Sequence, residues 1–193
     1  MKNSIRKIEG NWDLGYVLDK HVLSSSYIGD NAQGHPQFDT TRTEVGEALY
    51  QLKYKHDWNQ VPLLASEMAT HLYPLFKDVQ LLIPMPASNP RARQPVTELT
   101  GALGKIVQVP VFDNLLKKKH NGKQLKDLTG KAEKMEALQN TFSIDDTIAG
   151  DGKWNVLIVD DLFHTGASME AACSILRTYP KVLKIFVAAL TWR

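Results

Sequence analysis

Two adjacent carboxylates, followed by a loop of small and hydroxylated residues, form the part of this sequence best suited to chemistry. Asp160 and Asp161 follow an apolar run at residues 156–159, and Thr165 and Ser168 come a few positions later. Paired carboxylates can hold hydroxyl groups or Mg²⁺, and the N–H groups that open a helix attract an anion. The segment therefore has the residue types needed to bind a phosphorylated sugar.

These residues must be positioned by a strand, a short loop and a helix. An uninterrupted apolar run is typical of a parallel strand covered on both faces, and ligands of such sheets lie beyond the carboxyl ends of the strands. Gly166 lets the backbone approach a ligand closely. Taken singly, the two acids can be solvated loop residues and Thr-Gly-Ala-Ser an ordinary helix cap, but their order and spacing favour a site. Because strand neighbours point to opposite faces, we expect Asp160 and Asp161 to do different work.

Residues 156–168 resemble the phosphoribosyl pyrophosphate (PRPP) signature of the type I phosphoribosyltransferases. The resemblance implies that Asp160 and Asp161 are the catalytic pair. One would hold the ribose hydroxyls, and the other a hydroxyl, a metal-bound water or a proton; either can hold Mg²⁺ directly or through water or the hydroxyls. The loop that binds the 5-phosphate would consist of His164, Thr165, Gly166, Ala167 and Ser168.

A second apolar run, residues 81–83, leads into Pro84 and a pair of arginines. Proline lacks the N–H of a central ladder, so we expect the strand to end at Pro84. Pro-Met-Pro followed by arginines resembles the ComF-like (competence protein F) phosphoribosyltransferases, whose loop here binds pyrophosphate. The resemblance implies four pyrophosphate-binding candidates: Ala87, Ser88, Arg91 and Arg93. A solvated basic turn is the alternative for the arginines, and the family's following Gly-Phe-Asn-Gln is absent.

The ComF resemblance extends over residues 46–193 and includes residues 52–57, where His56 replaces the family's glycine. The cysteine-rich zinc module that many members carry is missing. Residues 117–134 contain seven lysines, and such a run is usually a solvated face. In type I enzymes, however, a basic mobile loop follows this strand and closes over PRPP. The resemblance therefore makes three lysines candidates for the flexible loop, with no choice among them: Lys118, Lys119 and Lys134.

The spacing of apolar residues predicts the elements that carry these motifs. Helices are expected around residues 45–52, 64–72, 95–107 and after residue 168, and strands at 81–84, 109–112, 141–144, 156–159 and 184–191. This order predicts an α/β fold with a parallel twisted sheet flanked by helices, the type I phosphoribosyltransferase fold, as one compact domain at residues 46–193.

Residues 1–45 are expected to form a small irregular N-terminal cap or hood. Short strands and a turn are its readable features, and His21 and His35 are predicted to be surface residues. In this fold class the acceptor base is often recognised by the variable cap. Four aromatic residues are candidates either for stacking on a base or for core packing: Trp12, Tyr16, Tyr27 and Phe38.

Composition gives the broad class of the protein. A net charge of +2 and 43% hydrophobic residues in 193 fit one globular domain and demand neither nucleic acid nor a membrane. The lone Cys173 cannot form an intramolecular disulfide and suits a reducing compartment as buried filler. The charged residues 1–11 lack an apolar signal core, and no run reaches the length of a membrane span. We expect a cytoplasmic protein without a membrane partner, and leave a homodimer open.

The sequence thus predicts an enzyme, a PRPP-binding phosphoribosyltransferase that passes 5-phosphoribosyl to an unidentified nitrogenous acceptor and releases pyrophosphate, with Mg²⁺ as cofactor. The alternative is a non-catalytic protein of this fold that binds single-stranded DNA in DNA uptake. The lysine run fits a phosphate backbone, but no aromatic residues are interleaved with it. A phosphorelay receiver or a Rossmann domain fits poorly, because the acid pair comes late and no early Gly-x-Gly-x-x-Gly exists.

Overall fold

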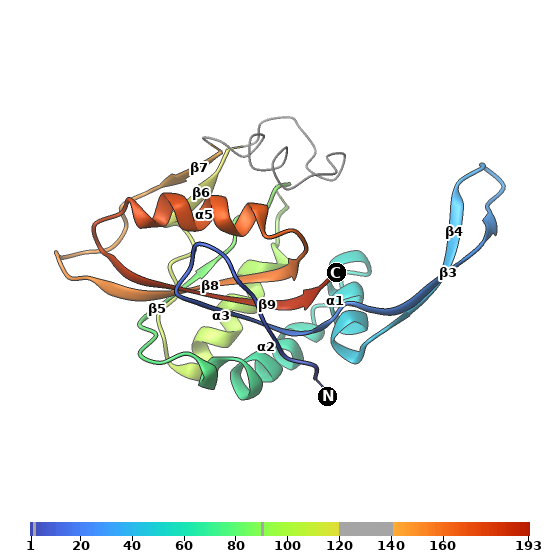
Figure 1. Cartoon of the computed structure of the whole chain (residues 1–193), viewed down its shortest axis with the longest axis horizontal. Helices are drawn as coiled ribbons and strands as arrows, with labels where there is room; N and C mark the ends of the chain where they lie inside the picture. Colours follow the sequence, from blue (N-terminus) through green and yellow to red (C-terminus); the bar gives the residue numbers. More distant parts are fainter. Residues whose placement is uncertain (2, 90, 120–140) are drawn as a thin grey trace.

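A five-stranded sheet forms the centre of the computed structural model, which describes residues 1, 3–89, 91–119 and 141–193 (Figure 1). The strand order is β1-β2-β9-β8-β5. Its strands are β1 (Arg6–Lys7), β2 (Leu14–Lys20), β9 (Val182–Trp192), β8 (Trp154–Phe163) and β5 (Leu81–Pro84). Every neighbouring pair is parallel except β1 and β2. The predicted α/β architecture with a parallel sheet is confirmed.

Helices cover both faces of the sheet (Figure 1). One face carries α1 (Glu44–Tyr54), α2 (Gln60–His71), the short 3-10 turn η1 (Tyr73–Leu75) and α3 (Pro95–Val107), and the other carries α5 (Ala167–Arg177). Side chains of β8 alternate between two apolar clusters. Leu157 and Val159 pack with the α1–α3 face, whereas Val156 and Ile158 pack with the α5 face. Burial on both faces explains why this strand is apolar throughout.

Two hairpins lie outside the central sheet. They are β3 (Val22–Asp30) with β4 (Pro36–Arg42), and β6 (Leu116–Lys118) with β7 (Phe142–Ile144). The β6–β7 pair lies on the α5 side and contributes Leu116 and Phe142 to the core there. The β3–β4 hairpin projects away from the body of the molecule (Figure 1). Within the described ranges, no helix is both long and apolar enough to cross a membrane.

Residues 1–45 differ from the irregular cap that their sequence suggested. Their strand β2 belongs to the central sheet, where Val17 and Leu18 are fully buried. β2 pairs with β9, near the other end of the chain, and local sequence gives no sign of such a distant partner. The prediction of a surface position for His21 is wrong, since only 6% of this residue is exposed, whereas His35 is exposed as predicted.

Several local predictions are confirmed. The helix at 95–107 is α3, and the strand ending at Pro84 is β5. The strand expected at 109–112 is reduced to a single bridge between Leu82 and Val111. The Leu82 N–H donates to the Pro110 carbonyl and the Phe112 N–H donates to the Leu82 carbonyl, both at 2.9 Å, and Pro110 has no N–H with which to extend this ladder. The strand expected at 141–144 is β7, outside the central sheet.

Cys173 is fully buried on the inner face of α5, as its predicted role of filler requires. Burial raises the pKa of its thiol to about 12. The reactive thiolate is therefore scarce at neutral pH, and this cysteine is chemically inert.

The start of α1 is fixed against the end of β2, and this contact positions the helix for the site described below. Thr43 caps the helix: its Oγ1 accepts the Gly46 N–H at 3.0 Å and donates to the Lys20 carbonyl at 2.6 Å. A Cβ added at Gly46 would lie 2.1 Å from the carbonyl oxygen of His21. Only glycine lets the helix approach this closely.

We expect Gly46→Ala to destabilise the fold by about 1–3 kcal/mol through this overlap, although alanine is the better helix former. Gly101→Ala in α3 is the matched control, because its Cβ would meet nothing within 4 Å. That substitution should stabilise by up to about 1 kcal/mol. Urea unfolding of both variants measures the difference, and equal effects would contradict the proposed clamp.

Candidate active site

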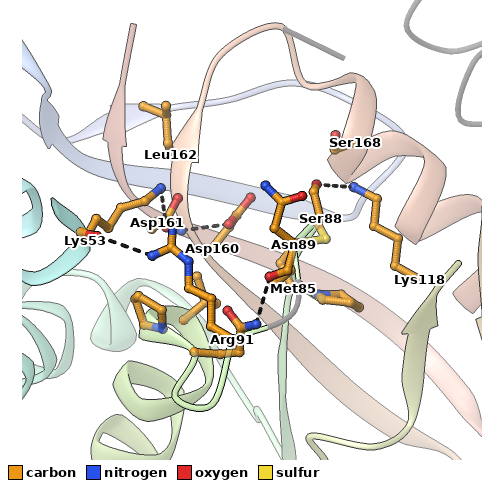
Figure 2. A pocket seen from close by; sticks show the side chains of 15 residues that line it. Lys53, Met85, Ser88, Asn89, Arg91, Lys118, Asp160, Asp161, Leu162 and Ser168 are labelled. Carbon is orange, nitrogen blue, oxygen red and sulfur yellow. Dashed lines mark hydrogen bonds and ion pairs between the residues drawn. The ribbon is translucent and has the colours of Figure 1, made fainter. Parts of the chain in front are cut away.

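A cavity of about 310 Å³ lies where β5 and β8 end, between the two helical layers (Figure 2). Its walls come from the end of α1, the loop after β5, the start of α3, strand β6, the end of β8 and the first turn of α5. The cavity therefore gathers the acid pair, part of the phosphate loop, the loop after β5 and one lysine of the basic segment. These parts are distant in sequence.

The acid pair reaches the cavity because β8 is longer than its neighbour β5. The last residue of β5, Pro84, pairs with Val159, and the Met85 N–H still donates to the Val159 carbonyl at 2.8 Å. Asp160 and Asp161 come next and have a partner only on the β9 side, where Asp160 pairs with Ala189. Their other side opens on the cavity.

The two carboxylates face opposite sides of the sheet, as expected from their adjacency. Asp161 continues the side of β8 that packs against α1–α3, and Asp160 continues the side that faces α5 and β6. Lys53 forms an ion pair with Asp161, whereas Asp160 is influenced by the charges of Lys53 and, more weakly, of Lys118. Different neighbours give the two acids different chemistry.

Asp161 forms an ion pair with Lys53, whose Nζ lies 2.7 Å from Asp161 Oδ2. Burial opposes the charge of Lys53, but the carboxylates of Asp161 and Asp160 outweigh it and raise the pKa of the lysine. The Arg91 guanidinium donates to the Lys53 carbonyl at 3.3 Å. Lys53 was not among the predicted site residues; its one sequence signal was its place in the ComF-like segment 52–57.

Asp160 has different surroundings from Asp161. Its Oδ1 accepts the N–H of Asp161 at 2.8 Å. Burial, followed by the negative charge of Asp161, raises the pKa of Asp160 to about 7, against the smaller influence of Lys53 and Lys118. A carboxyl group with a pKa near 7 is able to hold or pass on a proton at neutral pH.

Lys118 reaches the cavity from β6. Its Nζ donates to Ser88 Oγ at 2.9 Å and lies 5.3 Å from the centre of the Phe142 ring. Burial lowers the pKa of Lys118, although Asp160 opposes this. Of the three candidate lysines, Lys118 alone is seen at the cavity: Lys119 is exposed and does not line it, and Lys134 lies outside the described residues.

The loop after β5 contributes three of its four predicted residues. Ala87, Ser88 and Arg91 line the cavity. Arg93 does not, because its guanidinium pairs with Glu98 at 2.8 Å and stacks 4.0 Å from the ring centre of Trp58. The structure thus separates two arginines that the sequence could not tell apart.

The loop at 164–166 leads into α5, with glycine at the N-cap of the helix. Gly166 has φ +80°, and a Cβ there would lie 3.1 Å from the Phe163 ring. Among the residues that the structure describes, no side chain caps this helix, so N–H groups of its first turn keep their capacity for an anion. Ser168 lines the cavity, Ala167 is buried, and His164 is exposed; of the five predicted phosphate-loop residues, only Ser168 forms its wall.

The aromatic residues considered for base stacking lie elsewhere. Tyr27 and Phe38 are exposed on the projecting hairpin, where their rings contact each other at 5.9 Å. Trp12 is buried against Phe163, with ring centres 6.1 Å apart, and Tyr16 packs against the α1–α3 side of the core. None of the four lines the cavity.

The donor set suits a hard cation that shares its ligands with a substrate. Within the described ranges, no group of three or more His, Cys, Asp or Glu side chains could enclose a metal. Two carboxylates at an open cavity nevertheless fit Mg²⁺, which keeps several waters and usually takes its other oxygens from a phosphorylated ligand.

Comparison with known proteins finds no matching family model and no matching curated protein. Solved structures that are similar in chain course include adenine and hypoxanthine phosphoribosyltransferases and a UMP synthase. The adenine phosphoribosyltransferase of Leishmania tarentolae has a TM-score of 0.49 at 7% identity, covering 98% of this chain and 95% of its own. The Staphylococcus aureus hypoxanthine phosphoribosyltransferase has a TM-score of 0.42 at 12% identity, covering 69% of this chain and 63% of its own. The Leishmania donovani UMP synthase has a TM-score of 0.41 at 14% identity, covering 84% of this chain and 28% of its own.

This chain thus spans less than two thirds of the length of the last two enzymes. These values describe a likeness in the course of the chain, and the activities named are those of the similar enzymes.

The acid pair should show opposite responses to neutralisation. Because the pKa of Asp160 rises from 3.8 unfolded to about 7 folded, the folded protein binds more protons between these values, and stability falls as pH rises through this window. Asp160→Asn should remove that fall and be more stable than wild type at pH values above the window. Asp161→Asn should be less stable, since it leaves the Lys53 ammonium unpaired.

Chemical denaturation at pH 5 and at pH 8 measures both effects with isosteric substitutions. Parallel pH dependence in wild type and Asp160→Asn would show that Asp160 titrates as an ordinary carboxyl group.

Proposed function

We propose that the cavity binds PRPP and that the protein is a phosphoribosyltransferase, releasing pyrophosphate as it joins 5-phosphoribosyl to a nitrogen nucleophile. The observation that carries this proposal is the meeting of three features in one cavity: the Asp160–Asp161 pair, the first turn of α5, and the loop after β5. PRPP also has three parts to be recognised, a ribose, a 5-phosphate and a pyrophosphate. A volume of about 310 Å³ is in the range of small-molecule sites.

Each part of PRPP has a proposed set of contacts. Asp160 and Asp161 would hold the ribose hydroxyls, and the segment 164–168 would bind the 5-phosphate through backbone N–H groups and Ser168. The pyrophosphate would lie against the loop after β5 and Lys118. Within this enzyme class we favour a ComF-like protein, on the strength of residues 52–57 and the Pro-Met-Pro turn at 84–86.

The proposed reaction is displacement at the anomeric carbon of the ribose. As the bond to pyrophosphate breaks, negative charge grows on the departing oxygens and positive charge on the ribose ring. Arg91 and Lys118 would stabilise the negative charge on the departing oxygens, because preorganised cations cost no reorganisation during the reaction. The Asp161 carboxylate would lie beside the positive charge on the ribose ring. Asp160, with its raised pKa, would accept the proton that the attacking nitrogen loses.

Mg²⁺ would be held by Asp160 and Asp161, through water or the ribose hydroxyls, and would neutralise charge on the leaving group. The acceptor stays unassigned. The DNA-binding alternative depends on the lysine run at 117–134, most of which lies outside the described residues, so it stays a prediction from sequence.

Calorimetric titration with PRPP, with and without Mg²⁺, tests the proposal. Wild type should bind, and binding should tighten with Mg²⁺. The double variant Asp160→Asn/Asp161→Asn should lose roughly 100-fold or more in affinity, because each charge-assisted contact to the ligand contributes on the order of 1.5–3 kcal/mol. Asp145→Asn/Asp151→Asn is the matched control, since both residues are exposed and outside the cavity.

The same titration with inorganic pyrophosphate uses the contrast between the arginines. Arg91→Ala should weaken binding roughly tenfold, and Arg93→Ala should leave it unchanged while lowering stability through the loss of its Glu98 and Trp58 contacts.

Undiminished PRPP affinity in the double aspartate variant, or salt-sensitive DNA binding that PRPP does not compete with, would refute the proposal. Pyrophosphate release with a panel of purines, pyrimidines and amines then identifies the acceptor.

A further inference from the structure

The Lys53 ammonium occupies the position that a ligand of Asp161 would need. Its Nζ is 2.7 Å from Asp161 Oδ2, and only 24% of the lysine side chain and 13% of the aspartate side chain are exposed (Figure 2). Both residues line the cavity. A ribose hydroxyl or a cation can therefore reach this carboxylate oxygen only in competition with Lys53.

Both ends of this ion pair are held through their backbones. The Lys53 carbonyl accepts from Arg91, and α1 is fixed at its start by Gly46 against His21. On the other side, Thr191 Oγ1 donates to the Asp161 carbonyl at 3.1 Å and lies 3.1 Å from the Nδ1 of His21. With the backbones fixed, the movable part of the pair is the flexible four-carbon stem of the lysine.

The charges around the cavity favour a polyanion over a bare cation. Its walls carry two carboxylates, Asp160 and Asp161, and three cations, Lys53, Arg91 and Lys118. A divalent cation that approaches Asp161 alone meets the ammonium already paired there, and the described residues offer no third carboxylate or histidine to hold it. A phosphorylated ligand brings its own negative charge for the displaced lysine to pair with.

We propose that Lys53 is a displaceable counter-ion of Asp161: it excludes divalent cations from the empty cavity and turns to the polyphosphate when cation and polyphosphate enter together. This inference deepens the proposed function and rests on it only for the identity of the polyanion. It assigns to Lys53 the order of binding, in which the cation enters with the substrate and not before it.

Binding of Mn²⁺, as a paramagnetic substitute for Mg²⁺, tests the proposal on the intact chain by electron paramagnetic resonance. Wild type should bind Mn²⁺ weakly. Lys53→Met should bind it roughly tenfold more tightly or better, because a positive charge a few ångströms from the metal position is removed. Lys53→Arg keeps the charge and should exclude Mn²⁺ as wild type does. Lys55→Met removes the same charge from an exposed neighbour and should behave like wild type.

A second measurement uses inorganic pyrophosphate without metal. Lys53→Met should bind it severalfold more weakly than Lys55→Met does, since the ammonium would no longer pair with the anion. Thermal unfolding confirms that each variant is folded, and Lys53→Gln replaces Lys53→Met if the latter does not fold.

Equal Mn²⁺ affinity in Lys53→Met and Lys55→Met overturns the inference. So does a gain that survives in Lys53→Met/Asp161→Asn, because the cation would then bind elsewhere. These measurements do not depend on PRPP. If Lys53→Met binds Mn²⁺ more tightly but wild type does not bind PRPP, Lys53 is the counter-ion and PRPP is not the substrate. If wild type binds PRPP but Lys53→Met has no higher Mn²⁺ affinity, PRPP remains the proposed substrate and the counter-ion role of Lys53 is wrong.

Discussion

The difference in length between β8 and β5 is the constraint on which the site depends. β5 ends at Pro84, paired with Val159, whereas β8 runs on to Phe163. A strand that continues past its neighbour exposes one edge, and here the residues at that edge are the two aspartates. Had β5 extended by two residues, its backbone would have filled the cavity. The pairing ends one residue after Pro84, where the Met85 N–H donates to the Val159 carbonyl at 2.8 Å.

The alternation of side chains along β8 then gives the aspartates separate environments. Asp161 lies on the α1 face and is neutralised by Lys53, whereas Asp160 faces β6 and is left with burial and the charge of its neighbour. Two identical side chains therefore have different surroundings for a reason that is set by sheet geometry. The arrangement costs stability at Asp160, and such local cost is common where a fold keeps a group ready for a ligand.

Local sequence was sufficient for the parts of the molecule that depend on neighbouring residues. Helical spacing gave α3, proline gave the end of β5, and an apolar run followed by acids gave the position of Asp160 and Asp161. Contacts between distant segments were not accessible in this way. β2 pairs with β9, Lys53 meets Asp161 through the docking of α1, and His21 is buried by residues from both ends of the chain. The separation of Arg91 from Arg93 depends on Glu98 and Trp58, which a basic turn alone does not specify.

Carboxyl ¹³C NMR of the aspartates, followed across pH, tests the central claim most directly, because it reports the protonation of each acid separately. The account predicts that Asp160 titrates near neutrality, at a pKa of about 7. Lys53→Met should raise the pKa of Asp160 further, because the nearby ammonium charge lowers it. Titration of Asp160 in the ordinary range near 4 would contradict it, since burial and the charge of Asp161 would then have no effect on this carboxyl group.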